Sequence, residues 1–224
     1  MKIGNADIKP TKIICLGRNY LDHIRETNAQ IPTEPVFFVK TLNTLITDNQ
    51  PIIYPKILYE NQEYNRVDHE VELAFIMFQT GKNIEARFAF DYIQGYSIFL
   101  DMTARKMQIS DRNIKLPWYR SKNFDTFGPI GPKIIPCSDI EDPHNLNIQL
   151  KVNGELRQKS NTKHMLFKIP EIVEYLSKFV TLKRGDIIAT GTPSGIKPIF
   201  PGDIIEASIE KIGTIKHEVI LEKY

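Results

Sequence analysis

The hydrophobic pattern is clearest between Asp68 and Met77, where an acidic start gives way to an apolar run. From Val71 onward the run includes β-branched and aromatic side chains, which predicts a strand buried on at least one face. Side chains alternate along a strand, so Glu70 and Glu72 point the same way, roughly 7 Å apart. Two like charges on one buried face are costly unless something neutralises them. A bound divalent cation explains this pair better than separate salt bridges do.

A third carboxylate follows a second apolar run. Gly95–Leu100 predicts another strand, and Asp101 stands at its end. With Glu70 and Glu72 it makes an all-oxygen set without a nearby cysteine, which favours Mg²⁺ or Mn²⁺ over Zn²⁺. One oxygen from each residue leaves about three positions of an octahedral ion for water or a chelating substrate. The pattern alone leaves a second interpretation open, in which these are strand-end carboxylates paired with Arg or Lys.

Periodicity divides the remaining chain mostly into strands. The Asn153-Gly154 pair between two apolar runs is typical of a hairpin turn, and Pro170 suits the first turn of an amphipathic helix. Residues 41–68 are expected to form an extended loop with one short strand, and residues 116–132 a loop punctuated by Gly and Pro. Since strands outnumber helices and few are joined by them, the predicted fold class is α+β, mainly β, and not doubly wound. We expect strands at residues 12–17, 36–40, 146–152, 155 onward, 186–190, 204–209 and 215–221, and helices at residues 83–93, 103–110 and 169–180.

Three polar features outside these acidic strands carry candidate chemistry. His23 and Glu26 are three residues apart, so a helical turn sets them side by side, in a polar segment that reaches Pro35 and suits an exposed loop or lid. Lys122 lies among aromatic and small residues that can desolvate an ammonium. The Gly191–Gly195 turn offers backbone amides and a hydroxyl to an anion. Taken singly, the first two are more commonly a surface histidine and an ordinary solvated lysine.

The composition is ordinary for a globular protein, with 42% hydrophobic and 25% charged residues among 224. A net charge of +2 with mixed signs does not indicate the basic surface of a nucleic-acid-binding protein, so we expect no nucleic-acid partner. No apolar run approaches the length of a membrane span. Cys15 and Cys137 lie far apart and suit a reducing compartment. Because the N-terminus carries neither a signal core nor an Arg-rich presequence, we expect a cytoplasmic protein.

In combination these motifs resemble the fumarylacetoacetate hydrolase superfamily, from about Lys12 to the end of the chain. The motifs that carry the resemblance, in family order, are Glu70-x-Glu72, Asp101-Met-Thr-Ala-Arg, Lys122 before Asn-Phe-Asp-Thr-Phe-Gly-Pro, and Gly191-Thr-Pro-Ser-Gly. Three further motifs are similar more specifically to the acylpyruvase and oxaloacetate decarboxylase branch. They are Leu116-Pro-Trp, Lys151-Val-Asn-Gly-Glu-Leu-Arg-Gln, and Arg18-Asn-Tyr with His23 and Glu26. Thr41 and Lys197 depart from the family pattern, which has proline and glycine there, and this affects loop shape near the substrate.

The resemblance implies a mixed β-sheet roll of the fumarylacetoacetate hydrolase catalytic-domain type. It implies one catalytic domain over residues 1–224, usually a homodimer, with residues 18–35 as a lid. It also implies Mg²⁺ or Mn²⁺ bound by Glu70, Glu72 and Asp101. The residues it implies for substrate binding are Arg18, Tyr20, Arg105, Gln108 and Thr192.

For such a site the expected substrate is a short 2-oxo acid. Cleaving an acylpyruvate or losing CO₂ from oxaloacetate generates the same pyruvate enolate, which a metal and Lys122 can stabilise. Hydrolysis alone needs an activated water, for which His23 is the candidate base and Glu26 its orienting partner.

Two alternatives stay open. One is an isomerase or decarboxylase of 2-hydroxyhepta-2,4-dienedioate-type substrates, which a second cationic pocket would favour. The other is a catalytically silent binding module, against which the carboxylates, Lys122 and the His23–Glu26 pair argue.

Overall fold

A seven-stranded mixed sheet forms the centre of the computed structural model, which describes residues 1–4 and 6–223. Its order is β4-β3-β14-β8-β9-β11-β5, in which β3–β14 and β11–β5 pair in parallel and the other neighbours antiparallel. Every residue of β8 is buried, so its run is apolar on both faces apart from Glu72. The strands are β3 (Ile13–Gly17), β4 (Val36–Lys40), β5 (Leu45–Thr47), β8 (Val71–Met77), β9 (Ile93–Leu100), β11 (Gly128–Pro136) and β14 (Ile187–Ala189).

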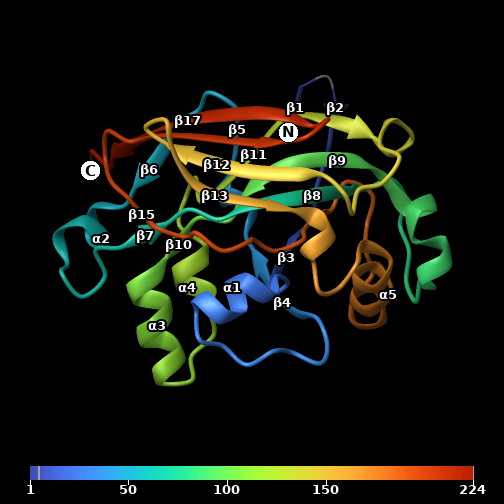
Figure 1. Cartoon of the computed structure of the whole chain (residues 1–224), viewed down its shortest axis with the longest axis horizontal. Coiled ribbons are helices and arrows are strands. Elements are labelled where there is room, and N and C mark those ends of the chain that lie inside the picture. The colour runs from blue at the N-terminus through green and yellow to red at the C-terminus, as the bar shows by residue number, and fades with distance from the viewer. Residues whose placement is uncertain (5, 224) are drawn as a thin grey trace.

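A second, five-stranded sheet packs on the first in the order β13-β12-β16-β17-β6. Alternate residues of its strands face inward, and Ile148 and Leu150 join Leu73 and Phe75 in one apolar core. In Figure 1 β8, β9, β11 and the five-stranded sheet lie across the upper half of the molecule, whereas β3 and β4 lie lower, beside α1. The strands are β6 (Ile52–Tyr54), β12 (Asn147–Val152), β13 (Glu155–Asn161), β16 (Ile204–Ile209) and β17 (Gly213–Leu221).

The helices α1, α3, α4 and α5 lie in the lower half of the molecule in Figure 1. The α-helices are α1 (Leu21–Glu26), α2 (Lys56–Glu60), α3 (Arg105–Asn113), α4 (Tyr119–Lys122) and α5 (Ile169–Phe179), and the 3₁₀ helices are η1 (Leu42–Thr44), η2 (Ala86–Tyr92), η3 (Cys137–Asp139) and η4 (Thr162–His164). Short strands complete the fold: β7 (Val67–Asp68), β10 (Thr103–Ala104) and β15 (Pro198–Ile199) form one sheet, and β1 (Lys2–Ile3) and β2 (Ala6–Asp7) another. None of the helices described here has the length and apolar character needed to cross a membrane.

The predicted α+β, mainly β class with a mixed sheet is confirmed. The hairpin is also confirmed: β12 and β13 pair antiparallel, and Asn153 and Gly154 take φ values of 51° and 80°. Positive φ at both turn residues is what an Asn-Gly hairpin turn requires. The helix expected at residues 169–180 is α5, which begins with Pro170 in its first turn.

The extended loop predicted for residues 41–68 is wrong in part, because the segment contains η1, β5, β6, α2 and β7. β5 and β6 are three residues long and pair in parallel with β11 and β17. Their strand form depends on partners far along the chain, which a local hydrophobic period does not reveal.

The loop predicted at residues 116–132 is also wrong, since it holds α4 and the first part of β11. Prolines normally argue against a central strand, but here the register of β11 against β9 shifts between Gly131 and Ile135, where an irregularity tolerates Pro132.

Three boundaries differ from the prediction. The helix expected at residues 83–93 is the 3₁₀ helix η2, in which Ala89 is buried and Phe90 exposed. The helix expected at residues 103–110 begins only at Arg105, because the two preceding residues pair with β7. Glu70 lies just before β8 and outside it.

Candidate metal centre

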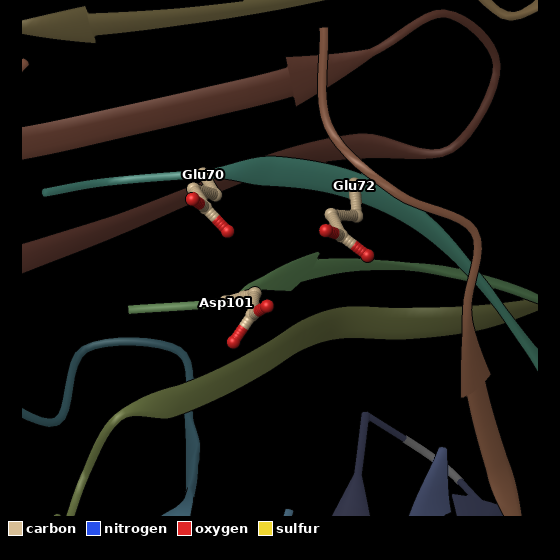
Figure 2. A group of neighbouring side chains, drawn as sticks. All are labelled: Glu70, Glu72 and Asp101. Carbon is tan, nitrogen blue, oxygen red and sulfur yellow. The ribbon is translucent and has the colours of Figure 1, made fainter. Parts of the chain in front are cut away.

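Three buried carboxylates meet where β8 and β9 lie side by side. Glu72 belongs to β8, Glu70 lies just before it, and Asp101 directly follows β9. The Asp101 N–H donates to the Glu70 carbonyl at 2.9 Å, which fixes the two segments in register. The three side chains offer oxygens within 4.8 Å of one another, and the residues are at most 4% exposed. Figure 2 shows Glu70 and Glu72 projecting from one side of the chain toward the space beside Asp101.

Two of these carboxylates are matched by cations. The Lys122 ammonium donates to Glu70 at 2.8 Å and to Asp101 at 2.5 Å, and Lys40 donates to Asp101 at 2.8 Å. Arg105 pairs with Glu70 and reaches the neighbouring Asp68 at 2.9 Å. Burial alone would raise the pKa of Glu70, but Lys122 and Arg105 outweigh it and hold that pKa well below its ordinary value. The interpretation as paired strand-end carboxylates therefore fits two of the three.

Glu72 is different. Among the described residues, its one hydrogen-bond donor is the Gly191 N–H at 2.8 Å, and no cationic side chain pairs with it. Burial, Asp101 and Glu70 together raise the pKa of Glu72 well above its ordinary value. A buried carboxylate in this state needs either a proton or a further cation.

The residues present fit a small divalent ion. All the candidate ligand atoms are carboxylate oxygens, the donor type that Mg²⁺ and Mn²⁺ prefer. Ligands at about 2.1 Å from one ion are at most about 4.2 Å apart, so the observed spread asks only for a small side-chain adjustment. We therefore regard Glu70, Glu72 and Asp101 as a candidate metal centre, as the sequence predicts.

The predicted histidine–carboxylate pair is present on α1. His23 Nδ1 lies 3.1 Å from Glu26 Oε2, and the other Glu26 oxygen accepts the Gly195 N–H at 2.9 Å. Asp22, on the same helix, accepts the Ser194 hydroxyl at 2.8 Å. These contacts tie α1 to the Gly191–Gly195 turn. With Nδ1 donating to Glu26, the His23 Nε2 atom keeps a lone pair that can accept a proton.

An inner cavity joins these groups. Besides the three carboxylates, the predicted site residues that line it are Arg18, His23, Arg105, Gln108, Lys122 and Thr192. Tyr20 does not line it; its hydroxyl is buried and has no hydrogen-bond partner in the described part of the chain. Glu26 stands behind His23 and lines an adjoining chamber.

The contacts of Arg105 and Thr192 limit what each can offer a ligand. Arg105 uses three of its five N–H groups, toward Asp68, Glu70 and Gln108, which leaves two. Thr192 donates its hydroxyl proton to the Val71 carbonyl at 2.9 Å, so its side chain can only accept.

Three residues that contact the site had no role predicted from the sequence: Lys40, Asp68 and Gln158. Lys40 is the last residue of β4 and is fully buried against Asp101. In the sequence, only its place at the end of a predicted strand pointed to such a role. Gln158, from β13, accepts from His69 Nδ1 and the Val71 N–H and donates to Thr192 and the Pro193 carbonyl. It thus holds the Gly191–Gly195 turn against the segment that carries Glu70 and Glu72, a role that no local pattern encodes.

Comparisons with known proteins identify the family. The family described as fumarylacetoacetate (FAA) hydrolase C-terminal matches residues 12–220. An uncharacterized protein of Pyrococcus abyssi is 50% identical over 98% of this chain and 94% of its own length. The mitochondrial oxaloacetate tautomerase FAHD1 of Bos taurus is 41% identical over 95% of this chain and 93% of its own length.

A solved structure has a similar fold. The fumarylpyruvate hydrolase of Pseudomonas aeruginosa, in complex with Mn²⁺ and pyruvate, superposes with a TM-score of 0.89 at 30% identity. The match covers 98% of this chain and 92% of that protein.

Proposed function

The chain belongs to the fumarylacetoacetate hydrolase family, and we propose that it binds one divalent cation, Mg²⁺ or Mn²⁺, at Glu70, Glu72 and Asp101 and converts short 2-oxo acids through an enolate. The observation that carries this proposal is Glu72, buried beside two other carboxylates without a cationic partner among the described residues. When bound, the dication would supply Lewis-acid stabilisation to a developing oxyanion.

Other side chains that line the cavity are suited to the remaining parts of the reaction. Lys122 is 2% exposed and fixed by Glu70 and Asp101, so it presents a positive charge that needs no reorganisation during the reaction. The two free N–H groups of Arg105 and the amide of Gln108 are suited to a substrate carboxylate. His23, oriented by Glu26, is the group placed to accept a proton.

The substrate we propose first is oxaloacetate, and the reaction is its keto–enol tautomerisation. Support comes from a relative named oxaloacetate tautomerase, which matches nearly the full length of this chain at 41% identity. In this reaction His23 Nε2 takes the proton from C3, the electron pair moves to the carbonyl oxygen, and that oxygen is protonated to give the enol. Decarboxylation of oxaloacetate runs through the same type of enolate but needs no base.

Acylpyruvate hydrolysis is the second candidate, and the His23–Glu26 pair favours it. A histidine whose Nδ1 is held by a carboxylate can take a proton from water, which then adds to the acyl carbon. A structural neighbour of this chain is named fumarylpyruvate hydrolase, which supports the same idea.

The deciding experiment measures all three reactions with purified protein and Mg²⁺ or Mn²⁺: oxaloacetate tautomerisation, oxaloacetate decarboxylation and acetylpyruvate hydrolysis. His23→Ala is expected to lower the reactions that move a proton by roughly 10²–10⁴-fold. Decarboxylation should fall much less, so the ratio of the other reactions to it should drop. An unchanged ratio would assign the base to another residue, and no turnover of any substrate with either cation would contradict the proposed function.

A further inference from the structure

One buried amide joins the second sheet to the candidate metal centre. Gln158 belongs to β13 and is fully buried. Its Oε1 accepts from His69 Nδ1 at 3.0 Å and from the Val71 N–H at 3.1 Å. Its Nε2 donates to the Thr192 hydroxyl and to the Pro193 carbonyl, both at 2.9 Å. A primary amide can accept two hydrogen bonds and donate two, so every hydrogen-bonding position of this side chain is used.

Three of these groups close a ring around the residue that separates two candidate metal ligands. Val71 lies between Glu70 and Glu72 in the chain, and its N–H donates to Gln158. The Val71 carbonyl accepts the Thr192 hydroxyl at 2.9 Å, and that hydroxyl in turn accepts from Gln158. Because a buried and fully satisfied hydrogen-bond network is rigid, the ring fixes both the N–H and the carbonyl of Val71.

Glu72 depends on this backbone more than the other two carboxylates do. Glu70 and Asp101 are held directly by cationic side chains. Within the part of the chain that the structure describes, Glu72 receives a single hydrogen bond, from the Gly191 N–H at 2.8 Å. Its position is therefore set by the peptide groups of the preceding residue, Val71, and by Gly191.

The turn that supplies the Gly191 N–H also rests on β13. Gly195 packs so closely on the Arg157 carbonyl that a Cβ at this position would overlap it. Gln158, the next residue of the strand, bonds to two residues inside the turn. A change in the Gln158 side chain would therefore reach both of the backbone groups that place Glu72.

We infer that Gln158 is a positioning residue for the metal centre, whose amide holds Glu72 where it can bind the divalent cation. This inference rests on the proposed function, because it requires a cation at Glu70, Glu72 and Asp101. Gln158 does not line the inner cavity, and His23 is oriented by a contact of its own. The loss of the amide should therefore weaken cation binding, and a high cation concentration should overcome that loss.

The test is calorimetric titration with Mn²⁺ in the absence of substrate. Gln158→Met keeps the length of the side chain and removes its four hydrogen bonds. Its dissociation constant for Mn²⁺ should be about 10–100-fold higher than that of wild type, the usual effect of losing a group that orients a metal ligand. In kinetics with oxaloacetate, the Mn²⁺ concentration for half-maximal activity should rise by the same factor, while kcat at saturating Mn²⁺ should stay close to wild type.

Gln149→Met is the matched control. Gln149 lies on the neighbouring strand β12, where its amide donates to the Ser208 hydroxyl at 3.0 Å, and it does not line the inner cavity. The variant makes the same replacement in the same sheet, so it should bind Mn²⁺ with wild-type affinity.

Thr192→Val opens the same ring from its other side, because it keeps the shape and removes the hydroxyl. It should also bind Mn²⁺ more weakly than wild type. The double variant should bind about as weakly as Gln158→Met alone, since residues of one hydrogen-bond network have effects that do not add. Thermal unfolding shows whether each variant folds, and if Gln158→Met does not, Thr192→Val decides the question.

The possible results separate the inference from the proposed function. Wild-type affinity for Mn²⁺ in folded Gln158→Met or in Thr192→Val would overturn the inference while the proposed function stands. A loss in Gln149→Met as large as that in Gln158→Met would overturn it too, because any loosening of the second sheet would then have the same effect. If wild type itself binds no Mn²⁺, the proposed function fails.

Discussion

The two ends of β14 each meet a buried carboxylate, and the two carboxylates have opposite surroundings. Asp186, directly before β14, is fully buried and accepts from the Thr11 N–H and hydroxyl, the Lys12 N–H and ammonium, and the Lys183 N–H. Beyond the other end, Gly191 donates the one hydrogen bond that Glu72 receives in the described part of the chain.

For this reason the pKa values of Asp186 and Glu72 shift in opposite directions. Burial alone would raise the pKa of Asp186, but Lys12 and the donors around it lower it overall. Burial and neighbouring carboxylates raise the pKa of Glu72. Asp186 has its charge matched and its lone pairs filled, whereas Glu72 is left short of both. This difference separates the two roles better than burial does, since both residues are buried.

The largest expected effect comes from Glu72→Gln, which keeps the shape and removes the charge. Activity on oxaloacetate should fall by more than about 10²-fold, because even an outer partner of a metal ligand contributes about 10–100-fold. Thermal stability without added dication should stay equal or rise, since an ionised carboxylate with a raised pKa disfavours the folded state. Wild-type turnover by this variant would remove Glu72 from the site.

A pair of lysine substitutions sharpens the contrast. Lys122→Met should lower kcat by roughly 10²–10³-fold, the usual cost of losing one preorganised donor to a developing oxyanion. Lys12→Met, which removes the ammonium beside Asp186, should lower stability and leave kcat unchanged. The measurement is steady-state kinetics on both variants together with thermal unfolding. If the two variants behaved alike, the two ends of β14 would not differ in role.

Asp186→Asn should weaken the fold and spare the chemistry. We expect the free energy of unfolding to fall by about 2–3 kcal/mol, the value of hydrogen bonds to a charged group. Urea unfolding should show a lower midpoint with an unchanged slope. Activity per folded molecule should match wild type, and a large loss of kcat would mean that Asp186 also supports the metal centre.

The smallest effect is a pH dependence of the same comparison. Because the folded-state pKa of Asp186 lies below its ordinary value of 3.8, its stabilisation is fully present above that value. It is lost as the pH falls through the folded-state pKa. The stability difference between wild type and Asp186→Asn should therefore be constant from about pH 7 to pH 5 and shrink below about pH 4. A difference that grew on acidification would have the wrong sign.

The parts of the site that the sequence predicts are those with a local signature. Glu70 and Glu72 alternate at the start of one apolar run, and His23 and Glu26 are one helical turn apart, so local spacing predicts that the members of each pair lie together. Asp101 joins the first pair through the pairing of β8 with β9. The same holds for the Asn153-Gly154 hairpin and for α5, whose pattern and turn residues lie within a few positions.

Other parts depend on contacts between distant segments. β5 and β6 exist through parallel pairing with β11 and β17, and β11 passes through Pro132 because its register shifts there. Lys40 meets Asp101 although three strands, β3, β14 and β8, separate β4 from β9 in the order of the sheet.

The central claim, that Glu72 is short of a cation because it binds one, is tested most directly by calorimetric titration with Mn²⁺ and Mg²⁺. The account predicts one equivalent bound by wild type, one equivalent with the same affinity bound by Asp186→Asn, and no binding by Glu72→Gln. The same stoichiometry and affinity in Glu72→Gln as in wild type would contradict it.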